Sequence, residues 1–364
     1  VYKSERIFIM NKFERLFAVL PDEIDAAIIT SDVNRRYFSG MKSSAGTVVA
    51  FRDKAYLIID FRYIEAATKK VKDAQVILQG KLFDQINELL KKHGAKTAAI
   101  ESDTMTVSML NMYKERITAA EIVSSSALSD AIGELRIVKT QDEIDKMIKA
   151  QRIAEAAFEN VLNFIKPGVT EKEIGLCLDY YMLKNGAEAL SFDTIAITGA
   201  NTSLPHGVPG DNVVKEGSFV LMDYGATYDG YHSDMTRTVC VGKPTEKMEQ
   251  VYNIVLDAQL KTIAAIKEGI TGHDADKVAR DVITAAGYGE MFGHSLGHGV
   301  GMEIHEAPTA APSSTRVLKE NMIVTVEPGI YIPGEFGVRI EDFVIVKKDG
   351  CENMTLAKKS LISL

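Results

Sequence analysis

The segment Lys215-Glu-Gly-Ser-Phe-Val-Leu-Met-Asp-Tyr-Gly225 recurs 104 residues later as Lys319-Glu-Asn-Met-Ile-Val-Thr-Val-Glu-Pro-Gly329. In both copies an apolar run typical of a buried strand ends at a carboxylate that stands two residues before a glycine. A second pair, Lys166-Pro-Gly-Val-Thr170 and Lys267-Glu-Gly-Ile-Thr271, is offset by 101 residues and opens a helical pattern each time. We therefore predict a duplicated α+β domain whose halves face each other across a cleft, since a solenoid needs at least three copies.

The first copy continues into a hairpin that carries a second carboxylate. Asp229-Gly230 is a typical two-residue hairpin turn, and Met235–Val241 has the apolar character of a returning strand. Side chains alternate between the two faces of a strand. Pairing about this turn therefore places Asp223 and Asp234 on one face, as diagonal neighbours.

The second copy repeats this arrangement with two glutamates. Glu327 closes the first strand, a loop around Gly334 turns the chain, and Glu341 lies on the return strand Arg339–Val346. Pairing about Gly334 again keeps both side chains on one face. A single acid in such a place is usually a surface hairpin residue, but four acids at matched positions of a repeat predict a shared site.

Histidines gather in the same part of the chain. His294, His298 and His305 fall within twelve residues that also contain several glycines, and His206 lies in Leu204-Pro-His-Gly-Val208. Glycine allows the backbone to approach a metal or a substrate closely. We expect structural or solvated roles for the remaining histidines, His93, His232 and His273.

Four carboxylates that converge on one cleft cannot all stay ionised without cations. Two divalent metal ions about 3.5–4 Å apart solve that problem and can stabilise a hydrolytic transition state. An oxygen-rich ligand set with one histidine suits manganese, cobalt, iron or zinc ions rather than a thiolate site. The sequence therefore predicts a two-metal hydrolase.

Four motifs carry a resemblance to a known family. They are Asp223-Tyr-Gly-Ala-Thr-Tyr-Asp-Gly-Tyr-His-Ser-Asp-Met-Thr-Arg-Thr238, Gly297-His-Gly-Val-Gly301, Val326-Glu-Pro-Gly-Ile-Tyr331 and Arg339-Ile-Glu341. With these motifs the chain resembles the metallopeptidases of the pita-bread fold, and its N-terminal domain makes it similar to the proline-directed members, aminopeptidase P and prolidase. The resemblance extends from Met10 to Leu364.

The resemblance implies a binuclear metal centre for hydrolysis of the bond between an N-terminal residue and proline. The two divalent ions are expected to be manganese, with cobalt, zinc or iron as alternatives. Glu327 is the expected general base, and Arg339 is expected to orient Glu341 or Asp234 from behind. The implied metal ligands are Asp223, Asp234, His298, Glu327 and Glu341.

The remaining histidines of the motif region are expected to face the substrate. The resemblance implies that His206 and His305 bind the scissile carbonyl or move protons, and that His294 lines the pocket for proline. Prolidases often carry an arginine four residues after the equivalent of His305, where it suits a dipeptide's carboxylate, but this chain has Thr309. We therefore favour an Xaa-Pro aminopeptidase that accepts longer peptides, with an Xaa-Pro dipeptidase as the alternative, and we expect a homodimer.

The region before the repeat predicts a separate, smaller α/β domain. The small polar stretch Ser124-Ser-Ser-Ala-Leu-Ser129 marks the expected boundary, which gives an N-terminal domain at residues 10–130 and a catalytic domain at residues 131–364. A helical pattern begins at Gln141 and ends before Lys166-Pro-Gly. The strand-like runs of the first domain are Ala26–Thr30, Thr47–Phe51, Ala55–Ile59, Gln75–Leu78 and Thr97–Glu101.

The composition argues against nucleic acid and membranes as binding partners and indicates a cellular compartment. The 364 residues carry a net charge of −8, so no overall positive field recruits nucleic acid or an anionic membrane. The sequence contains no run of 18 apolar residues, so we expect no membrane-spanning helix. The three cysteines, Cys177, Cys240 and Cys351, form no metal or disulfide motif, so we expect the cytoplasm.

Two other functions compete with this prediction. Gly293-His-Ser-Leu-Gly297 matches the nucleophile elbow of serine hydrolases, but such an elbow needs a helix after the serine, and Gly299-Val-Gly301 follows here. A non-catalytic pita-bread module that binds protein or RNA is the second alternative. Such a module typically loses its metal ligands, and all five are present in this chain.

Overall fold

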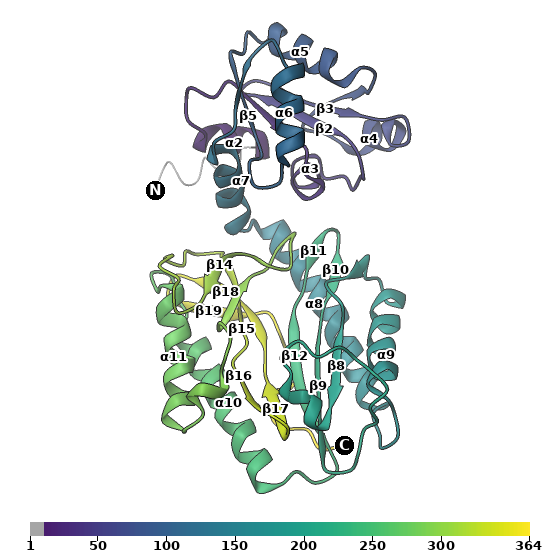
Figure 1. Ribbon diagram of the computed structural model, residues 1–364, viewed down its shortest axis with the longest axis vertical. Coiled ribbons are helices and arrows are strands. Elements are labelled where there is room, and N and C mark those ends of the chain that lie inside the picture. The colour runs from purple at the N-terminus through teal and green to yellow at the C-terminus, as the bar shows by residue number, and fades with distance from the viewer. Residues whose placement is uncertain (1–10) are drawn as a thin grey trace. The chain divides into compact units, whose positions relative to one another are not determined.

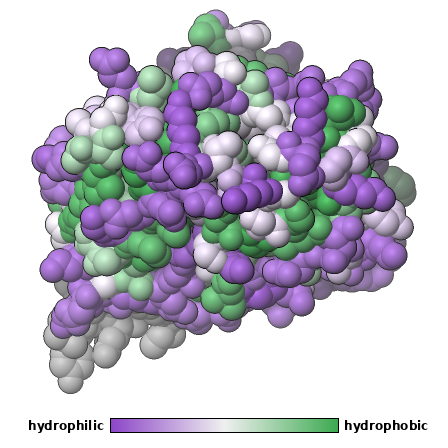
Figure 2. All heavy atoms as spheres, turned by 90° about the horizontal axis from the view of Figure 1, so that it is seen from below, coloured by the Kyte–Doolittle hydropathy of each residue, from purple (hydrophilic) through white to green (hydrophobic). Residues whose placement is uncertain are grey.

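The computed structural model describes residues 11–364, so Met10, where we expect the first domain to begin, lies outside the described residues. The chain divides into two compact units between Arg136 and Ile137, and each unit is described separately. The expected domain boundary at residue 130 stays a prediction. Figure 2 shows one face of the molecule, on which hydrophilic side chains are interspersed with apolar patches. Among the residues described, no helix combines the length and apolar character needed to cross a membrane.

The N-terminal unit is a six-stranded mixed sheet in the order β4-β3-β2-β1-β5-β6 with helices around it (Figure 1). The strands are β1 (Ala26–Ile29), β2 (Thr47–Phe51), β3 (Ala55–Ile59), β4 (Gln75–Leu78), β5 (Thr97–Ile100) and β6 (Glu121–Val123). The helices are α2 (Lys12–Val19), α3 (Asp32–Ser39), α4 (Ile64–Lys70), α5 (Leu82–Lys92), α6 (Val107–Arg116) and α7 (Ala127–Ile137). All five predicted strands occur. β1, β2 and β3 are buried along their whole length, as expected for central strands.

The C-terminal unit consists of two halves of similar element order. The first half contains α8 (Gln141–Leu162), α9 (Glu171–Lys184), β7 (Ala189–Leu190), β8 (Ile195–Thr198), the 3₁₀ helix η1 (Gly199–Ser203), β9 (Ser218–Tyr224), β10 (Ala226–Tyr228), β11 (Tyr231–His232) and β12 (Met235–Val241). The second half contains α10 (Glu246–Ala265), α11 (Gly272–Ala285), η2 (Gly289–Met291), β13 (Gly297–Gly299), β14 (Glu306–Ala310), β15 (Ile323–Val326), β16 (Gly329–Ile332), β17 (Phe336–Arg339), β18 (Asp342–Lys347) and β19 (Gly350–Asn353). Figure 1 shows α8 and α9 on one side of the strands and α10 and α11 on the other.

Local sequence explains where the helices of this unit begin. The hydroxyl oxygen of Thr140 accepts a hydrogen bond from the N–H of Glu143, and the Glu143 carboxylate accepts one from the N–H of Thr140. This capping box starts α8. α9 begins with the same box, formed by Thr170 and Glu173. α8 ends at Leu162, before Lys166-Pro-Gly, as the pattern predicts.

The repeat predicted from the sequence is present in the backbone hydrogen bonds. The N–H of Glu171 donates to the carbonyl of Asn212 at 2.9 Å, and the N–H of Gly272 donates to the carbonyl of Arg316 at 3.0 Å. A β-bridge stands beside each of these bonds, Thr170 with Val213 and Thr271 with Val317. Both halves therefore close the loop after their helix in the same way.

The strand registers agree with the predicted hairpins. Thr236 of β12 lies opposite Asp223 of β9, so Asp234 is the diagonal neighbour of Asp223 on the same face. Asp229 and Gly230 have φ values of 46° and 82°, as the tight turn between β10 and β11 requires. In the second half, the pairs of β16 with β17 are centred on Gly334, as predicted.

Candidate active site

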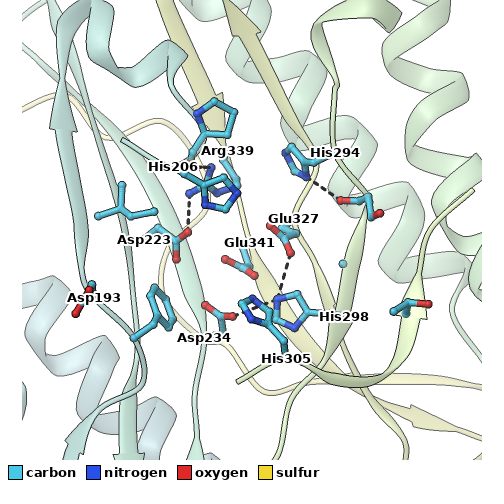
Figure 3. Close-up of a pocket in the computed structure, with 16 residues that line it drawn as sticks. Asp193, His206, Asp223, Asp234, His294, His298, His305, Glu327, Arg339 and Glu341 are labelled. Atoms are coloured by element: carbon cyan, nitrogen blue, oxygen red, sulfur yellow. Dashed lines mark hydrogen bonds and ion pairs between the residues drawn. The ribbon is translucent and has the colours of Figure 1, made fainter. Parts of the chain in front are cut away.

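A cavity of about 530 Å³ lies between the two halves of the C-terminal unit (Figure 3). Every side chain to which we assigned a site role contributes to its wall. Thr309, which we connected with substrate length, also lines it. The predicted residues brought together are His206, Asp223, Asp234, His294, His298, His305, Glu327, Arg339 and Glu341.

The four carboxylates come from matched strand ends. Asp223 is the penultimate residue of β9, and Asp234 directly precedes β12. Glu327 directly follows β15, and Glu341 directly precedes β18. Figure 3 shows the four side chains gathered around one region of the cavity.

The carboxylates destabilise one another's charge. Burial raises the pKa of Asp234 well above its ordinary value, and the charges of Asp223 and Glu327 raise it further. Burial and the charge of Asp234 act in the same direction on the pKa of Glu341. Burial, assisted by Asp223, also raises the pKa of Glu327 to about 8, against the opposing charge of Arg339. Such a cluster stays ionised only when positive charge compensates it.

His298 presents a free ring nitrogen to these acids. Its Nδ1 lies 3.1 Å from the carbonyl oxygen of Gly299, which can only accept, so Nδ1 carries the proton. Burial lowers the pKa of His298 to about 4, which keeps the ring neutral. Its Nε2 is 3.6 Å from Asp234 Oδ2 and 3.5 Å from Glu327 Oε1. A neutral imidazole with a fixed tautomer is the form that binds a metal ion.

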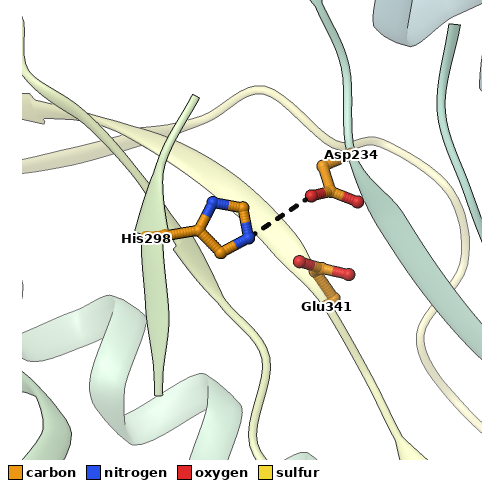
Figure 4. Close-up of side chains that lie close together, drawn as sticks. All are labelled: Asp234, His298 and Glu341. Atoms are coloured by element: carbon orange, nitrogen blue, oxygen red, sulfur yellow. Dashed lines mark ion pairs between the residues drawn. The ribbon is translucent and has the colours of Figure 1, made fainter. Parts of the chain in front are cut away.

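The donor set fits divalent metal ions. Donor atoms of Asp234, His298 and Glu341 lie within 4.8 Å of one another, and Figure 4 shows the three side chains converging. Oδ1 of Asp223 and Oδ1 of Asp234 are buried and have no hydrogen-bond partner among the described residues. A buried carboxylate oxygen without a partner is costly unless a cation coordinates it. These orphaned oxygens are therefore the strongest structural sign of a metal centre.

Arg339 organises one side of the cluster, although not with the partners we expected. We predicted that it orients Glu341 or Asp234, but its Nη2 lies 2.5 Å from Asp223 Oδ2. It reaches Glu341 only indirectly, because its Nε donates to Thr236 Oγ1 at 3.0 Å and that hydroxyl donates to Glu341 Oε2 at 2.7 Å. Thr236 lies directly opposite Asp223, so Arg339 contacts both residues, Thr236 through Nε and Asp223 through Nη2.

Tyr331 connects Arg339 with His294, and our sequence reasoning gave it no role. The Tyr331 hydroxyl accepts a hydrogen bond from Arg339 Nη1 at 2.8 Å and lies 2.9 Å from His294 Nε2. His294 Nδ1 faces the carbonyl of Ser295 at 2.8 Å, so Nδ1 is the donor and Nε2 accepts from Tyr331. Burial lowers the pKa of His294 to about 4, so the ring is neutral. In the hairpin centred on Gly334, Arg339 pairs with Gly329, and Tyr331 lies two residues after Gly329, so Tyr331 and Arg339 share one face. The predicted hairpin was therefore enough to place Tyr331 beside Arg339.

The other histidines fall into two groups, those that line the cavity and those that do not. His305 and His298 form a T-shaped pair with ring centroids 4.4 Å apart. His206 lies on the loop between η1 and β9 and lines the cavity from the first half. Three histidines are absent from its wall: His93 stacks on Phe51, His232 Nδ1 is 3.2 Å from Thr227 Oγ1, and His273 Nδ1 is 2.7 Å from the carbonyl of Pro312.

Ser295 does not occupy a nucleophile elbow. The residues that follow it form β13 at Gly297–Gly299, whereas an elbow needs a helix there. The backbone carbonyl of Ser295 accepts a hydrogen bond from His294 Nδ1, as described above, so that ring nitrogen holds its proton and cannot act as a base. The serine-hydrolase alternative therefore loses its structural basis.

Comparisons with known proteins agree with this geometry. Residues 145–348 match the model of metallopeptidase family M24, and residues 20–138 match that of the creatinase/prolidase N-terminal domain. The structure of an Xaa-Pro dipeptidase from Bacillus anthracis is 45% identical, with a TM-score of 0.93 over 97% of this chain and 99% of that one. An X-Pro aminopeptidase from Thermotoga maritima is 37% identical, with a TM-score of 0.91 over 96% of this chain and 100% of that one. The Xaa-Pro dipeptidase of Pyrococcus furiosus is 40% identical over 97% of this chain and 99% of its own length.

Proposed function

The chain belongs to metallopeptidase family M24, and from that premise we propose that it is an Xaa-Pro dipeptidase. The predicted pita-bread fold and the resemblance to the proline-directed peptidases are confirmed. We favoured an aminopeptidase because of Thr309, but the relatives named Xaa-Pro dipeptidase or prolidase support the alternative better. The proposed substrate is therefore a dipeptide with proline as its second residue.

The family requires divalent metal ions, and we propose two manganese ions as the native pair. When bound, the ions supply Lewis-acid polarisation of the scissile carbonyl and lower the pKa of water. The observation that carries the proposal is the pair of buried carboxylate oxygens, on Asp223 and Asp234, that lack any partner among the described residues. The proposed ligands are Asp223, Asp234, His298, Glu327 and Glu341.

The side chains around the ligands supply the proton transfers. Glu327 is the proposed general base for the attacking water, because it lines the cavity among the proposed ligands and its carboxylate accepts a hydrogen bond from Thr325 Oγ1 at 3.2 Å. His206 and His305 contribute to the cavity from different halves. We assign them to the scissile carbonyl and to the leaving nitrogen of proline.

His294 is the proposed wall of the proline pocket. Both of its ring nitrogens are already engaged, Nδ1 with the carbonyl of Ser295 and Nε2 with the hydroxyl of Tyr331. The ring therefore offers the substrate its uncharged face rather than a hydrogen bond. A flat neutral face suits the apolar, donor-free ring of a proline residue.

One assay tests the function. Purified protein is offered Ala-Pro and Ala-Pro-Ala separately, with added Mn²⁺ and with a chelator, and free alanine is quantified. Release from Ala-Pro that needs the metal supports the dipeptidase. Release from Ala-Pro-Ala alone would restore the aminopeptidase, and release from neither would leave a non-catalytic binding module as the better hypothesis.

Two further properties are proposed with the function. We expect a homodimer, and a monomeric mass by light scattering would contradict it. We expect the cytoplasm as its compartment, where the three cysteines, all unpaired in the structure, would stay reduced. Fractionation of the source cells tests that location.

A further inference from the structure

The loop that carries His206 is held by a buried carboxylate outside the cavity. The loop runs from residue 199 to residue 213, and we name it the His206 loop. Glu171, the first residue of α9, is fully buried and accepts four hydrogen bonds from the loop and the end of the strand that leads into it. The donors are the N–H groups of Thr198 (2.8 Å) and Gly210 (3.0 Å) and the side-chain amides of Asn201 (2.9 Å) and Asn212 (3.3 Å).

These donors lie on both sides of His206. Oε1 of Glu171 binds the entering stem through Thr198 and Asn201, and Oε2 binds the leaving stem through Gly210 and Asn212. One side chain thus fixes the separation of the two stems. Hydrogen bonds to a carboxylate are stronger than those between neutral groups, and burial removes competition from water.

The second half of the unit shows that this kind of loop closure does not itself require a carboxylate. Gly272 occupies the position equivalent to Glu171, and its N–H makes the equivalent bond to Arg316. A Cβ on Gly272 would lie 2.1 Å from the carbonyl oxygen of Thr309, so the backbone at Thr309 occupies the place that a side chain at residue 272 would need. The two halves share the backbone bonds, but the carboxylate that holds both stems of the His206 loop has no counterpart at Gly272.

The second half touches the His206 loop at other points. Nη1 of Arg339 donates to the carbonyl of Pro205 at 3.2 Å, directly beside His206, and the N–H of Gly337 donates to Thr202 Oγ1 at 2.8 Å. These bonds position the loop against the cavity wall, while Glu171 holds both of its stems. His206 itself makes no hydrogen bond within the described residues, so its place depends on the backbone that carries it.

We propose that Glu171 is a positioning residue for His206, acting through the two stems of the loop. The inference rests on the proposed function only for the catalytic consequence, since the order of the loop can be measured without turnover. Glutamine at this position keeps one acceptor oxygen but turns the other into an NH₂ group that faces N–H donors. Two of the four bonds are lost, and one stem is released.

The first test measures the order of the loop. Hydrogen–deuterium exchange at residues 199–213 is compared in the wild type, Glu171→Gln and Glu173→Gln. Glu173 lies two residues further along α9 and caps the same helix end from an exposed position, so it controls for loss of a carboxylate there. We expect exchange in the loop to quicken about tenfold or more in Glu171→Gln and to stay unchanged in Glu173→Gln. Equal exchange in all three proteins would overturn the proposal.

The second test links the loop to His206. Glu171→Gln is expected to lower kcat/KM for Ala-Pro by about 10–100-fold, mostly in kcat, with metal content unchanged. In a His206→Ala background the same substitution should change kcat/KM less than about twofold, because the group that it positions is gone. An equal loss in both backgrounds would show that Glu171 does not act through His206.

Two provisions keep the tests decisive. If Glu171→Gln does not fold, Asn201→Ala removes one donor and leaves the carboxylate in place, and it should quicken exchange in the loop in the same direction. Unchanged exchange in that variant would count against the proposal. If the wild type cleaves no Xaa-Pro dipeptide, the proposed function fails, and the exchange result alone decides whether Glu171 orders the loop.

Discussion

Replacing Arg237 with alanine is expected to destabilise the C-terminal unit strongly. Arg237 lies on β12 in the first half, and its ion pair with Asp342 of β18 in the second half measures 2.7 Å, with side chains 1% and 0% exposed. Burial by itself raises the pKa of Asp342, but the charges of Arg237 and Lys359 outweigh it and hold the pKa below its ordinary value. The guanidinium also donates to the backbone carbonyls of Thr236, Glu341, Ala357 and Lys358.

The magnitude follows from what the substitution leaves behind. Asp342 keeps Lys359 at 2.6 Å and Asn353 at 2.7 Å, but it loses its fully buried partner, and four carbonyls lose a donor together. Breaking a buried pair by removing one member costs about 3–5 kcal/mol, because the groups left behind stay desolvated. At about 2–4 °C per kcal/mol for a unit of this size, Tm should fall by about 6–20 °C. Arg237→Lys keeps the charge but not the planar fork, so it should lose a large part of the same energy.

The assay is urea unfolding of metal-depleted protein at pH 7. Far-UV circular dichroism suits it, because the chain contains no tryptophan for fluorescence. Lys261→Ala is the matched control, since its pair with Asp257 on α10 is exposed and such pairs contribute only about 0.3–0.5 kcal/mol. A loss in Arg237→Ala no larger than in that control would refute the argument that this residue holds the two halves together beside Glu341.

Three other outcomes are expected. Glu327→Gln should lower kcat by about 10²–10⁴-fold while metal analysis still finds bound metal, and activity close to that of the wild type would remove Glu327 as the base. Removing the metal with a chelator should lower Tm, and restoring Mn²⁺ to about 100 times its Kd should return about 2.7 kcal/mol of stability; a Tm that ignores the metal would count against the proposed ligands. Thr309→Arg should lower KM for Ala-Pro about tenfold and leave KM for Ala-Pro-Ala unchanged, because the new guanidinium is placed for the carboxylate of a dipeptide substrate and not for that of a longer peptide. Thr309→Gln should change neither value.

Much of the fold could be predicted from the sequence because local signals and the repeat agreed. The turn at Asp229-Gly230 fixed the register of the first hairpin, and short apolar runs between turn residues located five strands. β6 at Glu121–Val123 was missed because it has three residues, of which only Ile122 is buried. α6 was not predicted either, since Tyr113 is its one buried residue and its sequence lacks a clear apolar stripe.

The side-chain partners of the site were harder to predict. The repeat identified the acids, but nothing in the sequence decides which carboxylate Arg339 meets, because that choice depends on the rotamer of a long side chain across three strands. Glu171 illustrates the same limit. From its sequence position it is an ordinary acid in the first turn of a helix, where such residues are common. Its bonds become visible only when residues 199–213 fold back on the start of α9.

The duplication also explains why the two halves contribute unequally to the site. Each half offers two carboxylates from equivalent strands, but the second half adds His298. The backbone N–H of His298 donates to Thr325 Oγ1. By the same offsets the equivalent of His298 is Ile197, which pairs with Leu221 and is almost completely buried. A Cβ on Gly207 would lie 2.9 Å from the side chain of Ile197, so Ile197 packs directly against the backbone of the His206 loop. We therefore propose that one half uses this strand position for a metal ligand and the other uses it to support the loop that carries His206. On that proposal the two metal positions should differ in ligand set despite the pseudo-twofold fold.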